Sequence, residues 1–219
     1  MARPYLGPIT TEADWLASGS PEQMIRFLDV RGSLRRWQLF ACHCCWRIVP
    51  LLIDERSLRA VAMAERQAEG TASADEIALA LQDAQAAEVE VWATARRQSL
   101  GTAATAARRC LTTPRRVYHS AAAATASGAD RELIEQTDLL RDLFGNPFRP
   151  VVFDASWRTP TVRAMAEHFY AADGFTEMPI LGDALEDAGC ADVTVLDHCR
   201  QPGRHVRGCW VVDGLLEKP

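Results

Sequence analysis

Helix-starting residues recur along this chain, and apolar residues at helical spacing follow each of them. Thr11, Ser33 and Asp54 each precede such a segment. Ser20 with Gln23, and Ser73 with Glu76, have the spacing of capping boxes, in which a side chain at each end of the first turn binds a free backbone N–H. No stretch alternates between apolar and polar residues, as a half-buried strand would. The sequence therefore predicts an all-α fold, a bundle of many helices.

The segment GNPFRPVVFDASW, residues 145–157, interrupts this helical pattern with two prolines, a glycine and an asparagine. We interpret it as an irregular linker between an N-terminal helical lobe, residues 1–145, and a C-terminal helical lobe, residues 146–219, which pack as one globular unit. Arg149 lies between the two prolines, and its five guanidinium donors suit it to bind carbonyls or a carboxylate where the lobes meet.

The sequence also predicts where particular helices begin and end. The helix that Ser73 begins is expected to run to about Gln98, and Gly101 and Pro114 are expected to break the following Ala/Arg stretch. HVRGCWVVDGLLE, residues 205–217, is expected to form the last helix.

Neither a membrane span nor a secretory leader is evident in the sequence. Apolar residues make up 48% of the chain, but no run approaches the roughly 20 apolar residues of a spanning helix. The first residues lack the basic and apolar regions of a signal peptide. The sequence thus favours a cytoplasmic bacterial protein without a membrane partner, whose seven cysteines are thiols or ligands rather than a disulfide framework.

The stretch HCRQPGRHVRGCW, residues 198–210, concentrates metal-ligating side chains. His205 and Cys209 are four residues apart and would share one face of a helix, while the turn RQPG could fold His198 and Cys199 back toward them. Two imidazoles and two thiols suit tetrahedral zinc. His198, Cys199, His205 and Cys209 are therefore candidate zinc ligands.

Two other interpretations of the cysteines remain open. Cys209 and its neighbours can be core residues, with the histidines bound to carbonyls at helix ends. Cys199 with His205 and a nearby Asp has the residue types of a nucleophilic triad, but no catalytic signature accompanies them, so the sequence leans against an enzyme. In CHCC, residues 42–45, Cys44 is expected to lie on a buried stripe with Phe40 and Ile48, whereas Cys42 and Cys45 share another face. A site that joins Cys42 or Cys45 to His205 and Cys209 is the alternative.

Residues 91–129 contain six arginines and no acidic residue. On a continuous helix Arg97, Arg108 and Arg115 would nearly coincide, with Arg109 and Arg116 about a quarter turn away. Such a face could bind an acidic partner or phosphates, or it could pack on the chain's own acidic helices, around Glu88 and Glu90 for example. The five arginines are candidate partner-binding residues. Nucleic acid is the weaker alternative, because 23 of the 24 basic residues are Arg, as in a GC-rich genome, and the net charge is -5.

Several motifs resemble those of an uncharacterised bacterial family abundant in planctomycete genomes. They are TEADWL, LFACHCCWRI, LLRDLFGNPFRP, MPILGDALEDAGC and DHCRQPGRHVRGCWVVDGLL, and they span Thr11 to Leu216. The family often has a small residue in place of His43 and Arg in place of Trp46, which speaks against a site built around His43. No activity, cofactor or partner is attached to the family, so the resemblance implies kinship alone.

These patterns favour a non-enzymatic module that binds another protein, as an interaction or regulatory part of a cytoplasmic complex. The first alternative is a zinc-binding protein with its His/Cys cluster near the C-terminus. The second is an accessory protein that binds nucleic acid through the Arg-rich segment 91–129.

Overall fold

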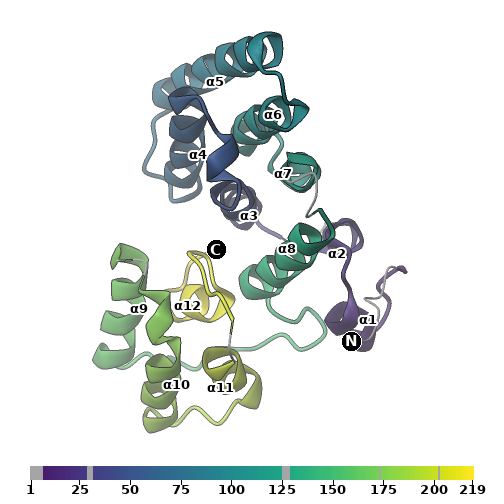
Figure 1. The fold of residues 1–219 in the computed structure, drawn as a ribbon. Helices are drawn as coiled ribbons and strands as arrows, with labels where there is room; N and C mark the ends of the chain where they lie inside the picture. The colour runs from purple at the N-terminus through teal and green to yellow at the C-terminus, as the bar shows by residue number, and fades with distance from the viewer. Residues whose placement is uncertain (1–6, 29–31, 125–128, 173, 202) are drawn as a thin grey trace. The chain divides into compact units, whose positions relative to one another are not determined.

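A computed structural model describes residues 7–28, 32–124, 129–172, 174–201 and 203–219. The described residues form twelve α-helices with short 3-10 turns and no strand, which confirms the all-α prediction (Figure 1). The chain divides into two compact units, residues 1–138 and residues 139–219. The division falls within α8 (Ala129–Phe144), whereas the expected boundary lay after it, at residues 145/146.

Unit 1 contains seven helices and the first part of α8. The seven are α1 (Glu12–Ala17), α2 (Pro21–Leu28), α3 (Leu34–Trp46), α4 (Glu55–Ala68), α5 (Ala74–Thr94), α6 (Gln98–Thr112) and α7 (Val117–Ala124). Short 3-10 turns at Val49–Leu51 and Pro114–Arg116 separate α3 from α4 and α6 from α7. The expected caps are present: Thr11, Ser33, Asp54 and Ser73 each accept a backbone N–H in the first turn of their helix.

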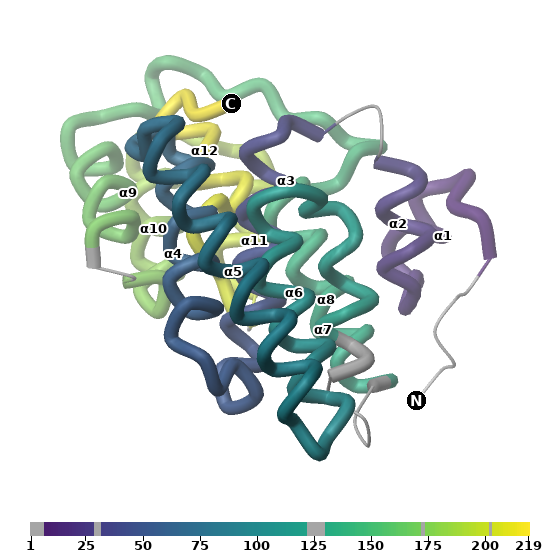
Figure 2. Tube along the Cα trace, turned by 90° about the horizontal axis from the view of Figure 1, so that it is seen from above, coloured from purple at the N-terminus to yellow at the C-terminus, as the bar shows by residue number. Residues whose placement is uncertain are grey.

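The core of unit 1 forms around α3, which packs against α4, α6 and α7. Trp37, Leu39 and Phe40 of α3 are fully buried. Small residues of α6, among them Ala103, Ala106 and Ala107, are buried as well, which lets the helices approach closely. Figure 2 shows α5 and α6 side by side, and α5 packs on both α4 and α6.

The expected break at Gly101 is wrong. The helix that Ser73 begins ends at Thr94, and α6 then runs through Gly101 to Thr112. Gly101 lies where a Cβ would overlap the indole of Trp92 on α5, so the glycine permits close helix packing and does not end a helix. The break at Pro114 is confirmed, since it lies in the turn between α6 and α7.

Unit 2 contains the end of α8, an irregular segment and four further helices. The four are α9 (Pro160–Ala172), α10 (Met178–Asp187), α11 (Val193–Arg200) and α12 (Trp210–Leu215). Gly145 ends α8 with a left-handed φ of 66°, as expected from its position after Phe144. The core unites Phe169 of α9, Leu181 of α10, Val195 of α11 and Val211 of α12, all fully buried.

The expected final helix is shorter than predicted. Only Trp210–Leu215 is helical, and His205 to Cys209 form a turn instead. Gly208 has a φ of +95°, which a residue with a side chain rarely adopts and which is incompatible with a helix at this point. The face shared by His205 and Cys209 therefore does not arise from helical spacing.

Among the described residues, no helix is long and apolar enough to cross a membrane.

Gly214 of α12 provides a test of packing in unit 2. A Cβ at this position would overlap the ring of Phe153, which lies in the irregular segment. We expect Gly214→Ala to destabilise unit 2 by about 1–3 kcal/mol, because the ring must move out of its contact with Trp210. Chemical denaturation measures this change in the free energy of unfolding. Gly203→Ala is the matched control, since a Cβ there would meet no atom within 4 Å, and an equal loss in both variants would contradict the packing argument.

Candidate metal centre

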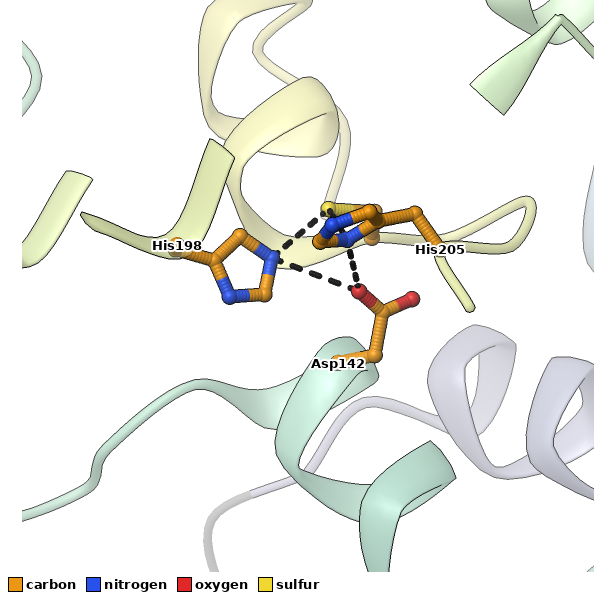
Figure 3. Close-up of side chains that lie close together, drawn as sticks. Asp142, His198 and His205 are labelled. Carbon is orange, nitrogen blue, oxygen red and sulfur yellow. Dashed lines mark hydrogen bonds and ion pairs between the residues drawn. The ribbon is translucent and has the colours of Figure 1, made fainter. Parts of the chain in front are cut away.

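Four metal-ligating side chains of unit 2 meet at one point. Asp142 lies in the last turn of α8, His198 in the last turn of α11, and His205 and Cys209 in the turn that precedes α12. One donor atom from each lies within 4.8 Å of the other three. Figure 3 shows Asp142, His198 and His205 directed toward one another.

The contacts between the donor atoms are short. Asp142 Oδ1 lies 2.7 Å from His205 Nδ1 and 3.3 Å from His198 Nε2. Cys209 Sγ lies 3.2 Å from His198 Nε2 and 4.0 Å from His205 Nδ1. The two imidazole rings also pack edge to face, with centroids 4.7 Å apart.

Each histidine uses a single nitrogen toward both the carboxylate and the thiol. His198 presents Nε2 to Asp142 and to Cys209, and His205 presents Nδ1 to the same two groups. A catalytic triad needs the opposite arrangement, in which one ring nitrogen faces the nucleophile and the other faces the carboxylate. The four donors converge on a common centre, where they could hold a metal ion.

Asp142 is the charged anchor of this cluster. Its Oδ2 accepts the backbone N–H of Val206 at 3.0 Å, which leaves Oδ1 for the two histidines. Burial alone would raise the pKa of Asp142, but hydrogen bonds from His198 and His205 hold that pKa below its ordinary value. The carboxylate is thus ionised while it is buried, as a metal ligand must be.

Cys209 contributes a fully buried thiol. Burial, followed by the nearby charge of Asp142, raises the pKa of this thiol well above its ordinary value. A raised pKa disfavours the free thiolate, which is the form that a nucleophilic cysteine needs. A bound cation would lower the pKa of this thiol, because a thiol that coordinates a metal is deprotonated.

The turn from His205 to Cys209 is held by its own backbone and by a neighbouring tyrosine. Cys209 N–H donates to the carbonyl of Val206 at 2.9 Å, and Gly208 N–H donates to the hydroxyl of Tyr170 at 3.2 Å. The Tyr170 hydroxyl in turn donates to Asp213, which is fully buried on α12. Partners of this kind fix the orientation of metal ligands.

Three of the four predicted ligands are in the cluster, and Cys199 is not. Cys199 is buried in the apolar core of unit 2, with its Cβ 3.1 Å from the place that a Cβ on Gly182 would take. Burial, followed by the neighbouring Cys190, raises the pKa of Cys199 to about 12. Neighbouring residues on a helix are about 100° apart, so Cys199 faces the core while His198 faces the cluster.

Asp142 is the member that the sequence did not indicate. It lies in DLLRDLF, where an acidic residue looks like the polar side of an amphipathic helix. It precedes the two histidines by more than fifty residues, so no local spacing joins it to them. The aspartate is nevertheless almost fully buried, which an ordinary surface position would not be.

The cysteines of the CHCC stretch are buried in unit 1, which the sequence predicts for Cys44. Cys42, Cys44 and Cys45 are all inaccessible to solvent. Cys45 Sγ lies 3.4 Å from Cys110 Sγ on α6, and Cys42 Sγ donates to the carbonyl of Val61 on α4. These thiols fill the contacts of α3 with its neighbouring helices.

The Arg-rich segment does not form one continuous face. Arg97 precedes α6, and the 3-10 turn at Pro114–Arg116 interrupts the helix before the last two arginines. Arg108 forms an ion pair with Glu88, which belongs to the acidic helix that the sequence offered as an alternative partner.

Two of the other arginines are also engaged within unit 1. Arg109 donates to Ser120 Oγ at 2.7 Å, and the Arg115 guanidinium lies 5.2 Å from the ring centre of Trp37. Arg97 and Arg116 are exposed. Binding of a protein or a nucleic acid by these residues stays a prediction.

Arg149 is exposed in the irregular segment of unit 2, where its backbone N–H donates to the carbonyl of Asn146 at 3.0 Å. Binding of carbonyls or a carboxylate by its guanidinium where the lobes meet stays a prediction.

No protein-family model matches the chain, and no curated protein or solved structure matches it.

Proposed function

We propose that this protein binds one zinc ion through Asp142, His198, His205 and Cys209. The observation that carries the proposal is the convergence of four donor atoms from three separate segments on a single point, with each histidine directing one nitrogen to it. Hydrogen bonding among side chains does not require such a common centre, whereas coordination does.

The ligand set favours zinc over other divalent cations. Two imidazole nitrogens, one thiolate and one carboxylate oxygen suit a borderline-soft ion, and they are poor ligands for magnesium or calcium, which prefer six or more oxygens. Zinc–ligand distances of about 2.0–2.3 Å in a tetrahedron place ligand atoms about 3.3–3.8 Å apart. The distances of 3.2 and 3.3 Å around His198 Nε2 are close to that range, and those of 2.7 and 4.0 Å around His205 Nδ1 lie below and above it.

The proposed role of the ion is structural. A catalytic zinc site keeps one position for water or substrate, whereas four protein ligands fill a tetrahedron. The four side chains are mostly or fully buried, and they come from the end of α8, the end of α11 and the turn before α12. The ion would hold these three segments together.

Metal analysis of two cysteine variants tests the ligand set. We expect the wild-type protein, purified without chelator, to carry about one zinc per chain, and Cys209→Ala to lose it. Cys199→Ala is the matched control, because Cys199 is equally buried and lies next to His198 but is not in the cluster. It should keep the metal. Mass spectrometry of the metal content measures all three samples.

Cobalt substitution gives a second readout. Tetrahedral cobalt with one thiolate has a sulfur-to-metal charge-transfer band, which should vanish in Cys209→Ala and persist in Cys199→Ala. Wild-type protein that takes up neither zinc nor cobalt on refolding would overturn the proposal. A band that survives in Cys209→Ala and vanishes in Cys199→Ala would instead overturn this ligand set.

A further inference from the structure

Helix α5 exposes an apolar face to solvent. A helix in a soluble protein normally has polar residues on the side away from the core. On α5, Leu79 is 62% exposed and Val89 is 69% exposed. The helix buries only Ala84, Ala87 and Val91 against α4 and α6.

One row of exposed residues on α5 has the spacing of a coiled-coil seam. Its members alternate by four and three positions: Asp75, Leu79, Gln82, Ala86, Val89 and Ala93. This 3–4 alternation keeps a stripe on one side of a helix and matches the packing of two helices at a shallow angle. The stripe from Asp75 to Ala93 is about 27 Å long at 1.5 Å per residue.

The stripe is self-complementary when two copies run antiparallel. Leu79 and Val89 are equally distant from the middle of the stripe, so Leu79 of one copy would lie against Val89 of the other. Gln82 and Ala86 would pair in the same way. A twofold interface repeats every contact, so each apolar contact counts twice.

Charge favours the same orientation. Asp75 stands at the start of α5, and Arg96 and Arg97 follow its end, with all three exposed. In an antiparallel pair Asp75 of each copy approaches the two arginines of the other, whereas a parallel pair would place like charges together.

The acidic residues along the edge of the stripe are paired with arginines of α4, which reduces their repulsion in a dimer. Glu76 binds Arg66 at 2.8 Å, and Glu90 binds Arg56 at 2.5 Å. Asp83 lies 4.0 Å from Arg59. Arg56 also binds Asp54 at 2.8 Å, and Arg59 also lies 3.7 Å from Glu55. These ion pairs reduce the negative charge beside the seam but do not cancel it.

We propose that the protein forms a twofold dimer through the exposed face of α5, paired antiparallel with α5 of a second copy. The small side chains of Ala86 and Ala93 permit close approach of the two helices, and Leu79 and Val89 supply the apolar contact. Asp75 with Arg96 and Arg97 fixes the direction. The dimer is independent of the metal centre, which lies in unit 2.

Sedimentation of the full chain over a range of concentrations tests the dimer. We expect a dimer whose dissociation constant rises by about 100-fold or more in Val89→Glu, because two carboxylates enter one apolar seam. The matched control is Val193→Glu, at a residue of α11 that is 67% exposed and far from the stripe in sequence. It should leave the constant unchanged. A monomer at every concentration, or equal effects of the two variants, would overturn the proposal.

Cysteine cross-linking tests the direction. All seven native cysteines are buried, so an introduced surface thiol reacts selectively. With oxidised glutathione, a mixture of Leu79→Cys and Val89→Cys proteins should yield a disulfide-linked heterodimer, and neither protein alone should cross-link to itself as readily. Preferential cross-linking of Leu79→Cys to itself would indicate a parallel pair and would refute the antiparallel arrangement.

Discussion

Removal of the proposed zinc ion is expected to unfold or loosen unit 2 while unit 1 keeps its structure. A ligand present at about a thousand times its dissociation constant stabilises the folded state by about 4 kcal/mol. In a domain of this size a change of 1 kcal/mol shifts the melting temperature by about 4–8 °C. Chelation should therefore lower the melting temperature of unit 2 by well over 10 °C.

Hydrogen exchange measured by mass spectrometry locates this effect. Amides of residues 139–219, above all those around Val206 and Gly208, should exchange faster after chelation, and those of α3 and α4 should not. Cys209→Ala should already exchange like the chelated wild-type protein and respond no further to chelator. A uniform change in both units would show that the chelator acts elsewhere than at this cluster.

The helices could be predicted from the sequence because their signals are local. A cap such as Ser73 with Glu76 binds backbone groups within one turn, so a few residues determine where the helix begins. Gly101 shows the limit of such signals. The same residue type ends a helix at Gly145, where φ is positive, and admits the indole of Trp92 at Gly101, and only the packed structure distinguishes the two.

The candidate site was found in part because three of its members are close in sequence. His198, His205 and Cys209 were singled out by residue type, but the expected helical face was wrong, since a turn at Gly208 brings His205 and Cys209 to the cluster. Asp142 comes from another helix. Its role depends on a tertiary contact between α8 and the turn before α12, and no spacing in a single sequence reports that contact.

A buried ion pair in unit 1 should be sensitive to the loss of either partner. Arg47, which follows α3, donates its Nε to both oxygens of Glu132 at 3.1 and 3.0 Å. Gln136 donates to the same carboxylate at 3.1 Å. The Glu132 side chain is only 7% exposed, so its charge depends on these partners.

We expect Arg47→Met to lower the free energy of unfolding by about 3 kcal/mol, because Glu132 is left buried without its cation. The more exposed Glu135, 3.1 Å from Arg47, loses its partner as well. Arg26→Met is the matched control. It removes an exposed i,i+4 pair with Glu22, which contributes about 0.3–0.5 kcal/mol. Chemical denaturation of both variants compares the two losses.

The double variant Arg47→Met with Glu132→Leu distinguishes two explanations of that loss. If the cost of Arg47→Met comes from the stranded carboxylate, the second substitution removes the charge and restores about 2 kcal/mol or more. If the cost comes from lost packing of the Arg47 stem, the double variant is at least as unstable as the single one. Recovery would show that the pair holds the end of α3 to α8 in a particular arrangement and adds little net stability over an apolar contact.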